Sequence, residues 1–266
     1  MKKTVLITGA SSGLGKALAE HYAAAGHDVY GTSRHAHNYQ NGAPTMLQMD
    51  VLDPASIERA VTQVLEQSGR IDLLINNAGL GIAAPAEEAS LEYTHRVFDT
   101  NVYGVIRVCQ TVLPSMRQTG RGQIINISSI GARVGLPFRG IYCGSKAALC
   151  TMTESLRLES KPFGIQVCSV LLGDVRTNIN ANRIKSYKAS GPYAAVFEKT
   201  CEQIDREVEE GMPADKAAQS IGRLSERPFL PPRYTVGKPL QRLSITLKNL
   251  LPATWFEWAL SRYVQE

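Results

Sequence analysis

The sequence TGASSGLG, at residues 8–15, decides the fold of this chain of 266 residues. It follows a short apolar run at Thr4–Thr8 and opens a segment of helical period at Leu14–Ala25. Glycines between a strand and a helix let the backbone approach a ligand closely, and free N–H groups at the start of the helix attract a phosphate. This context favours a pyrophosphate-binding loop over a plain connecting turn. We expect these residues to contact the phosphates: Gly9, Ser11, Ser12, Gly13, Leu14 and Gly15.

Short apolar runs alternate with segments of helical period along most of the chain. This alternation is typical of a parallel sheet covered by helices on both faces. Asp53 before Pro54 is the N-cap signal of one helix. The sequence therefore predicts an α/β, Rossmann-like, doubly wound parallel sheet of about seven strands in a single domain over residues 1–266. The expected strands are 4–8, 28–33, 46–49, 71–76, 123–128, 165–172 and 233–237.

Two segments lie outside this alternation. Residues 178–211 lose clear periodicity, and a substrate lid is expected there because ligands bind outside the carboxyl ends of parallel strands. Its apolar and aromatic residues either face the substrate or pack on the sheet: Ile179, Tyr187, Pro192, Tyr193 and Phe197. Residues 238–266 predict a helical extension with a leucine stripe, followed by two tryptophans. That stripe would rest on a membrane surface, cover the substrate cleft or form a subunit interface: Leu240, Leu243, Leu247, Leu250 and Leu251.

Composition narrows the class of protein. The net charge is +5 and the basic residues are spread along the chain, which gives little support to nucleic-acid binding. The five cysteines form no CxxC pair and the five histidines show no ligand spacing, so we expect neither a disulfide framework nor a metal site. The N-terminal apolar run is too short for a signal peptide, and no run is long enough for a membrane-spanning helix. These features predict a soluble, cytoplasmic protein.

The end of the second expected strand indicates which dinucleotide is preferred. An NAD-binding site usually has an acidic residue there for the ribose hydroxyls, but this chain has Ser33 and Arg34. Arg34 offers a cation to a 2′-phosphate; the alternative is a solvated loop charge. We therefore expect NADP(H) to be preferred, with NAD(H) as a possible second cofactor.

Tyr142 and Lys146 lie four residues apart in a segment of helical period that continues to about Glu159. They therefore share one face of the helix. An ammonium on that face favours the phenolate and lowers the pKa of the tyrosine, which would let it exchange a proton at neutral pH. Such a pair is common by chance when it stands alone.

Here the pair occurs together with the glycine loop, with NNAG at residues 76–79 and with INISS at 125–129. In this combination the chain resembles the short-chain dehydrogenase/reductase family over Lys3–Thr177. The glycine spacing GxxxGxG, unlike GxGxxG, is also similar to that family. The stretch GLPFRGIYC, residues 135–143, resembles the 17β-hydroxysteroid dehydrogenase branch, which includes retinol dehydrogenases.

The resemblance implies a set of catalytic residues. Ser129 matches the serine that binds the reacting oxygen, with Ser128 as the alternative if the register differs by one. Tyr142 would donate a proton to the carbonyl oxygen while the nicotinamide donates a hydride, and Lys146 would pass on the replacement proton. Asn101 matches the asparagine that positions a water beside that lysine.

The resemblance also extends the cofactor site. Asp50 and Val51 match an adenine contact, although Asp50 could equally be a turn aspartate. The ribose and the nicotinamide would be held by residues that follow later strands: Asn77, Ala78, Gly79, Gly173, Val175 and Thr177. Leu172 stands where the family has a proline.

Together these features favour an oxidoreductase that interconverts a lipophilic alcohol and its ketone or aldehyde, such as a steroid, a retinoid or a long-chain compound. The alternatives are a reductase of acyl or sugar ketones, and a non-catalytic regulatory protein that binds NADP(H). By resemblance, the segments 101–117 and 144–159 pair subunits, so a homodimer or homotetramer is expected. Peripheral membrane contact through residues 238–266 stays one of the three interpretations of the tail.

Overall fold

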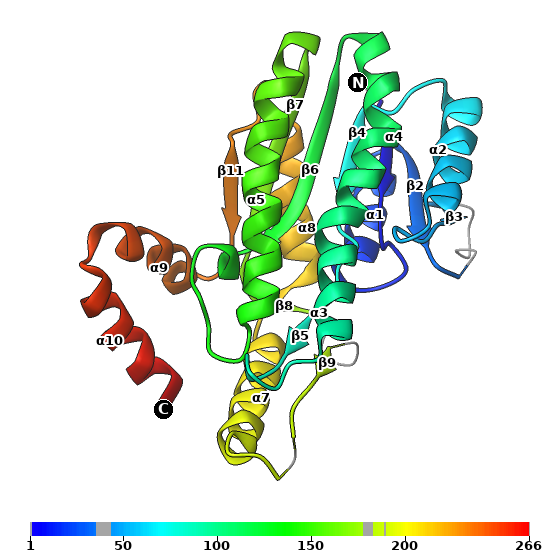
Figure 1. Ribbon diagram of the computed structural model, residues 1–266. Coiled ribbons are helices and arrows are strands. Elements are labelled where there is room, and N and C mark those ends of the chain that lie inside the picture. The colour runs from blue at the N-terminus through cyan, green and yellow to red at the C-terminus, as the bar shows by residue number, and fades with distance from the viewer. Residues whose placement is uncertain (1, 36–43, 178–182, 189, 266) are drawn as a thin grey trace.

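The computed structural model describes residues 2–35, 44–177, 183–188 and 190–265. Its centre is a parallel sheet of seven strands in the order β11-β7-β6-β4-β1-β2-β3 (Figure 1). This confirms the predicted Rossmann-like fold. The strands are β1 (Thr4–Ile7), β2 (Asp28–Ser33), β3 (Thr45–Gln48), β4 (Leu73–Asn76), β6 (Gly122–Ser129), β7 (Ile165–Leu172) and β11 (Arg233–Val236).

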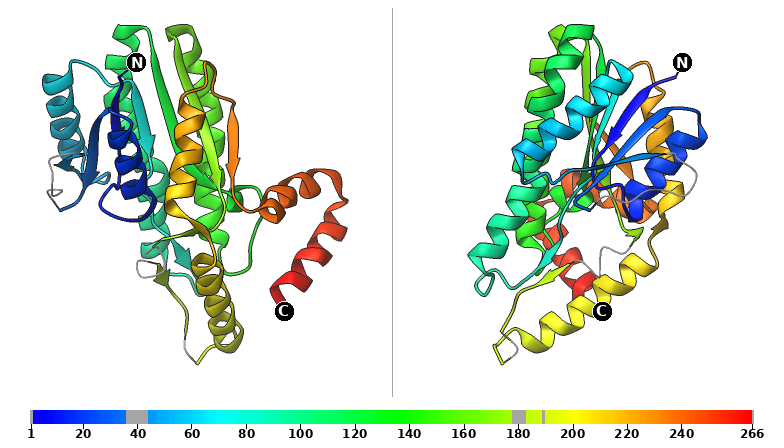
Figure 2. Two further views of the ribbon diagram at one scale, coloured as in Figure 1. Left: turned by 180° about the vertical axis from the view of Figure 1, so that it is seen from behind. Right: turned by 90° about the vertical axis from the view of Figure 1, so that its right-hand side faces the viewer.

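Helices cover both faces of the sheet, because alternate strand residues point to opposite faces. Val5 and Ile7 of β1 pack with α1 (Gly13–Ala24) and α8 (Ala214–Ser225), whereas Leu6 packs on the other side. That side carries α2 (Pro54–Ser68), α4 (Gly104–Thr119) and α5 (Gly140–Ser160). Figure 1 shows α4 and α5 in front of the sheet, and the view from behind in Figure 2 shows α1 and α8.

The strand order reverses beside β1. The chain proceeds from β1 to β2 and β3 on one side, then returns to β4 and continues outward to β6 and β7 on the other. A crevice forms at the carboxyl ends of the strands where such a reversal occurs. The glycine loop after β1 and the NNAG loop after β4 both lie at that crevice.

Local signals in the sequence place the helices around this sheet. The Asp53 side chain accepts a hydrogen bond from Ala55 N at 3.0 Å and caps α2 as predicted. Gly69 ends the same helix in the left-handed conformation, at φ 72°. Between α3 (Leu91–Phe98) and α4 the helix contains a π-helical turn at Asp99–Tyr103. Such turns often occur at functional sites, and Asn101 lies on this one.

The segment 178–211 differs from the expectation of an irregular lid. Residues 178–182 and 189, and with them Ile179, lie outside the described residues. After β8 (Val175–Arg176) and β9 (Ile184–Lys185), the segment forms the helix α7 (Ala194–Glu209). Threonine and cysteine replace apolar residues on its inner face, which weakens the periodic signal in the sequence. The buried face is Phe197, Thr200, Cys201, Ile204 and Val208.

Shorter elements complete the fold. They are β5 (Ile82–Ala83), β10 (Met212–Pro213), and the 3₁₀ turns η2 (Ile130–Ala132) and η3 (Lys161–Phe163). The chain ends in two helices, α9 (Pro239–Leu250) and α10 (Ala253–Gln265), which stand away from the sheet in Figures 1 and 2. Among the described residues, no helix is both long enough and apolar enough to cross a membrane.

Candidate active site

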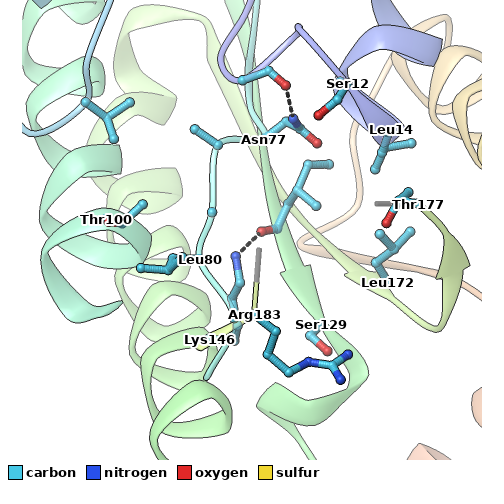
Figure 3. A pocket seen from close by; sticks show the side chains of 18 of the residues that line it. Ser12, Leu14, Asn77, Leu80, Thr100, Ser129, Lys146, Leu172, Thr177 and Arg183 are labelled. Carbon is cyan, nitrogen blue, oxygen red and sulfur yellow. Dashed lines mark hydrogen bonds between the residues drawn. The ribbon is translucent and has the colours of Figure 1, made fainter. Parts of the chain in front are cut away.

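A cavity of about 390 Å³ opens at the carboxyl ends of β1, β4, β6 and β7. The predicted residues come together on its wall, although they come from loops far apart in the sequence. Figure 3 shows Ser12 and Asn77 near one end and Ser129 near the other. The predicted residues that line it are Gly9, Ser11, Ser12, Gly13, Leu14, Gly15, Ser33, Arg34, Asp50, Val51, Asn77, Ala78, Gly79, Ser129, Tyr142, Lys146, Gly173, Val175 and Thr177.

The glycine loop is a cradle without room for side chains. A Cβ on Gly15 would lie 2.1 Å from Gly9 O and 2.5 Å from Asn77 Nδ2. Gly9 and Gly13 have φ of +68° and +53°, which favours glycine. Asn77 Nδ2 donates hydrogen bonds of 3.0 Å to Thr8 O and Gly9 O and so fixes the loop to the end of β4 (Figure 3). The Ser12 side chain caps no helix N–H, so the N–H groups at the start of α1 can bind an anion.

The end of the cavity beside β2 and β3 has the polar groups expected for the adenosine. Ser33 is buried at the end of β2, and the exposed Arg34 follows on the cavity wall. Asp50 Oδ1 accepts a hydrogen bond from Leu52 N at 3.0 Å, so this aspartate has the turn role as well as a place in the cavity. The glycine cradle and the helix N-terminus fit the pyrophosphate of a dinucleotide, and Arg34 lies at the end of the cavity expected for its adenosine.

Ser129 and Tyr142 form the reaction end. Ser129 is the last residue of β6, and its Oγ accepts a hydrogen bond from Gly131 N at 3.0 Å. Burial raises the pKa of the Tyr142 phenol, and a side-chain hydrogen bond with Ser129 lowers it by a smaller amount. The net pKa lies above its ordinary value, so the phenol keeps its proton at neutral pH. A phenol in this state is suited to donate a proton.

Lys146 is buried one turn after Tyr142. Its Nζ donates a hydrogen bond of 2.9 Å to Ile127 O, as Figure 3 shows. Burial lowers the pKa of this lysine to about 8. The pKa of Tyr142 is raised, not lowered as expected from the position of Lys146, because burial of the phenol is the largest influence on it. A lysine with a pKa near 8 can both accept and release a proton near neutral pH.

Asn101 is fully buried behind this end of the cavity and is not part of its wall. Its Oδ1 accepts from Leu80 N at 2.8 Å, and its Nδ2 donates to Leu80 O at 2.9 Å and to Ser145 Oγ at 3.1 Å. A Cβ on Gly79 would lie 3.3 Å from Asn101 Oδ1 and 3.5 Å from Lys146 Nζ. The asparagine thus fixes the NNAG loop beside the lysine.

Four charged residues that sequence reasoning did not assign to the site also line the cavity: Arg96, Arg139, Asp174 and Arg183. Arg139 Nη2 and Arg183 Nη1 form ion pairs of 2.8 Å with Glu207 and Asp205 of α7. The Arg183 side chain is largely buried, and Figure 3 draws it and Ser129 among the lining side chains. The sequence signal for two of them was only their closeness to predicted residues, which is weak evidence by itself. Arg139 precedes Tyr142 by one helical turn, and Asp174 directly follows the Leu172–Gly173 pair.

The Asp174 side chain is held in place by a hydrogen bond from the C-terminal extension. Gln241 Nε2 of α9 donates a hydrogen bond of 2.5 Å to Asp174 Oδ2. Among the described residues, no cation lies within ion-pair distance of this carboxylate, and burial raises its pKa. A Cβ on Gly173 would lie 2.2 Å from Gln241 Oε1, so this glycine makes room for the contact.

The aromatic side chains of the lid pack together and do not line the cavity. The Phe197 ring lies 4.5 Å from that of Tyr187 and 5.5 Å from that of Phe138, centroid to centroid. Tyr193 joins them through Phe138 at 6.3 Å. These aromatics thus neither line the cavity nor pack on the seven-stranded sheet; they pack on one another, on Phe138 and on Ala83 of β5. The apolar part of the cavity wall comes instead from Leu80, Ile82, Leu172 and Val208.

Comparison with known proteins identifies the family to which this fold and site belong. A family model described as short chain dehydrogenase matches residues 3–188. The chain belongs to this family. A 3-ketodihydrosphingosine reductase of Bacteroides thetaiotaomicron is 41% identical over 258 residues, which cover 96% of each chain. The structure of a short-chain dehydrogenase from Streptomyces avermitilis superposes with a TM-score of 0.82 at 31% identity and covers 100% of both chains.

Two further structures of the short-chain dehydrogenase fold contain a nicotinamide cofactor. One from Burkholderia phymatum, in complex with NAD, has a TM-score of 0.79 at 25% identity and covers 93% of each chain. One from Burkholderia cenocepacia, in complex with NADP, has a TM-score of 0.73 at 26% identity and covers 92% of each. The chain is therefore an oxidoreductase of a family that uses nicotinamide cofactors.

Proposed function

We propose that this protein is an NADP(H)-dependent reductase of a long-chain ketone of the 3-ketodihydrosphingosine kind. The observation that carries the proposal is the reaction end of the cavity, where a protonated Tyr142 and Ser129 lie beside the unpaired carboxylate of Asp174. The similarity to the Bacteroides reductase extends over nearly the whole chain and supports this substrate class.

The proposed reaction uses the residues as follows. Ser129 Oγ and Tyr142 Oη donate hydrogen bonds to the ketone oxygen and hold it. When bound, NADPH would supply the hydride, and with it two electrons, to the carbonyl carbon. The proton of Tyr142 moves to the oxygen, so the ketone becomes a secondary alcohol, and Lys146 returns a proton to the phenolate. The proton that Lys146 passes on comes from solvent.

Arg34 supports NADP(H) over NAD(H), because it places a cation at the end of β2 where NAD enzymes place an acid. It is the main argument for this preference, since structures of the fold with either cofactor are known. Ser33, Asp50 and Val51 would complete the adenosine site.

Asp174 is the residue that would distinguish the proposed amino ketone from other long-chain ketones. In 3-ketodihydrosphingosine an amino group is attached to the carbon next to the ketone, and a long alkyl chain leaves from the other side. A carboxylate beside Ser129 and Tyr142 can bind the ammonium form of that amino group. The nearby Arg139 weakens this attraction, but it is ion-paired with Glu207. Leu80, Ile82 and Val208 provide apolar wall for the chain.

The test is the loss of NADPH absorbance with a panel of carbonyl compounds. We expect 3-ketodihydrosphingosine to be reduced faster than a ketone of equal length without the amino group, and both faster than sugar or short acyl ketones. Asp174→Asn should raise KM for the amino ketone by about tenfold or more, because a hydrogen bond to a charged group is lost, and leave the plain ketone almost unaffected. Equal losses on both substrates would show that Asp174 does not bind the amino group. Preferential reduction of a steroid ketone or of retinal would favour those substrate classes instead.

We propose that the protein forms a homodimer or homotetramer through α4 and α5. Each helix region carries exposed apolar side chains, with Tyr103 54% and Leu158 72% exposed. All five cysteines carry buried free thiols, which is consistent with our proposal of a cytoplasmic location. Light scattering of the purified protein measures the oligomeric state.

A further inference from the structure

The C-terminal arm, defined here as α9 and α10, carries an unusual amount of exposed apolar surface. Five of its large apolar side chains are between 49% and 75% exposed. On α9 the exposed leucines recur every three to four residues with Leu247 between them, so they form one stripe. The two tryptophans are three residues apart on α10. The five side chains are Leu240, Leu243, Leu250, Trp255 and Trp258.

The arm does not bury this surface against its own subunit. In both Figure 1 and the left view of Figure 2, α9 and α10 stand out from the sheet and its helices. The principal contacts of α9 outside the arm are with the short turn η2, and those of α10 are with α9. In this structure the leucine stripe therefore does not pack over the subunit's own cleft. A lipid surface and a second copy of the chain are the other two interpretations.

The charges of the arm favour the lipid surface. Arg242, Lys248 and Arg262 of the arm, and Lys238 directly before it, accompany the apolar stripe, with Glu257 as the acidic residue among the described ones. Two like-charged arms would repel each other, whereas anionic headgroups attract clustered lysines and arginines. Exposed tryptophans beside cations are typical of segments that lie in a membrane interface.

The arm is also connected to the active site. Gln241, in the first turn of α9, donates its hydrogen bond to Asp174 on the cavity wall, and Lys238 N donates to Gln241 Oε1 at 3.1 Å. The turn η2, which α9 contacts, directly follows Ser129. The root of the arm therefore lies at the reaction end of the cavity, while its apolar stripe faces outward.

We propose that the C-terminal arm docks on an anionic membrane surface and brings the mouth of the cavity to the lipid from which the substrate comes. The exposed leucines and tryptophans insert among the acyl chains next to the headgroups, and the lysines and arginines bind the anionic headgroups. The delivery of substrate rests on the proposed function, but the docking itself does not.

The two tryptophans of the arm are the only ones in the chain, so intrinsic fluorescence reports on the arm alone. The full-length protein is mixed with vesicles of phosphatidylcholine, or of phosphatidylcholine with phosphatidylglycerol, each made with brominated acyl chains that quench tryptophan. We expect a blue shift and quenching with the anionic vesicles and much weaker effects with phosphatidylcholine alone. Each neutralised cation, as in Arg242→Gln or Lys248→Gln, should weaken binding by about fivefold.

The variant Leu240→Glu/Leu250→Glu removes apolar surface and keeps both tryptophans. It should bind anionic vesicles at least about tenfold more weakly, because two leucines no longer enter the lipid. The control Leu91→Glu/Phe229→Glu changes two side chains of similar exposure, 73% and 80%, outside the arm and should bind normally. NADPH binding by both variants checks that they are folded.

Absence of quenching with every vesicle would overturn the proposal. So would a change from dimer to monomer in Leu240→Glu/Leu250→Glu without lipid, since the stripe would then bind a second copy. If vesicle binding fails while detergent-dispersed ketone is still reduced, the docking is wrong and the proposed function stands. If vesicles bind but no long-chain ketone is reduced, the docking stands and the proposed function is wrong.

Discussion

Replacing the buried Lys146 by methionine should stabilise the free protein at neutral pH while removing activity. The pKa of this lysine falls from its ordinary value of 10.5 to about 8 because its ammonium is desolvated. At pH values below 8 the charged form is buried, and the fall in pKa corresponds to about 3 kcal/mol of lost stability. The hydrogen bond from Lys146 Nζ to Ile127 O returns about 1 kcal/mol, which methionine would lose. The net gain expected for Lys146→Met is about 2 kcal/mol at pH 7.

The sign of the pH dependence follows from the lowered pKa. Between pH 8 and pH 10.5 the unfolded chain holds a proton on this lysine that the folded chain has released, so the wild type gains stability as pH rises through this window. The variant lacks that gain, so its advantage should shrink by about 2 kcal/mol between neutral pH and pH about 10. Urea unfolding of the cofactor-free protein measures the free energy at each pH. The control is Lys161→Met, at an exposed position. Parallel stability curves for wild type and Lys146→Met, or a less stable variant at pH 7, would refute the reasoning.

Two further predictions concern the cofactor site. Arg34→Asp should move the ratio of kcat/KM from NADPH toward NADH by about tenfold or more, because a cation near the 2′-phosphate becomes an anion; an unchanged ratio would contradict this. Gly15→Ala should abolish NADPH binding and lower the free energy of unfolding by about 1–3 kcal/mol, since its Cβ meets Gly9 O at 2.1 Å. The control is Gly135→Ala, where a Cβ meets nothing within 4 Å. NADPH titration and thermal unfolding distinguish the two variants, and equal behaviour would show that the loop can relax.

The fold and much of the cofactor site could be predicted because their signals are local. The glycine loop has a distinctive spacing between a strand and a helix, and Asp53 caps α2 with its own side chain. Residues at the carboxyl ends of parallel strands meet at one edge of the sheet, so the order of the motifs along the chain predicts their proximity. Ser129 and Tyr142 follow this rule.

The charged residues at the reaction end of the cavity could not be predicted, because their positions depend on ion pairs and hydrogen bonds between segments that are distant in the sequence. Arg139 and Arg183 take their positions from Glu207 and Asp205 on α7, a helix whose mixed inner face hid its period. Asp174 depends on Gln241, which lies 67 residues further along the chain. The electrostatic state of Tyr142 likewise depends on burial, which raises its pKa where helical spacing alone suggested a lowered one.

The most direct test of the chemistry is Tyr142→Phe, which removes one oxygen and keeps the ring. NADPH binding, measured by fluorescence titration, should change little, because the glycine loop, Asn77 and Arg34 are intact. Single-turnover reduction of the long-chain amino ketone should fall by about 10²-fold or more, since the carbonyl oxygen loses its proton donor. Retention of wild-type turnover by a Tyr142→Phe protein that binds NADPH normally would contradict the assignment of Tyr142 as the proton donor.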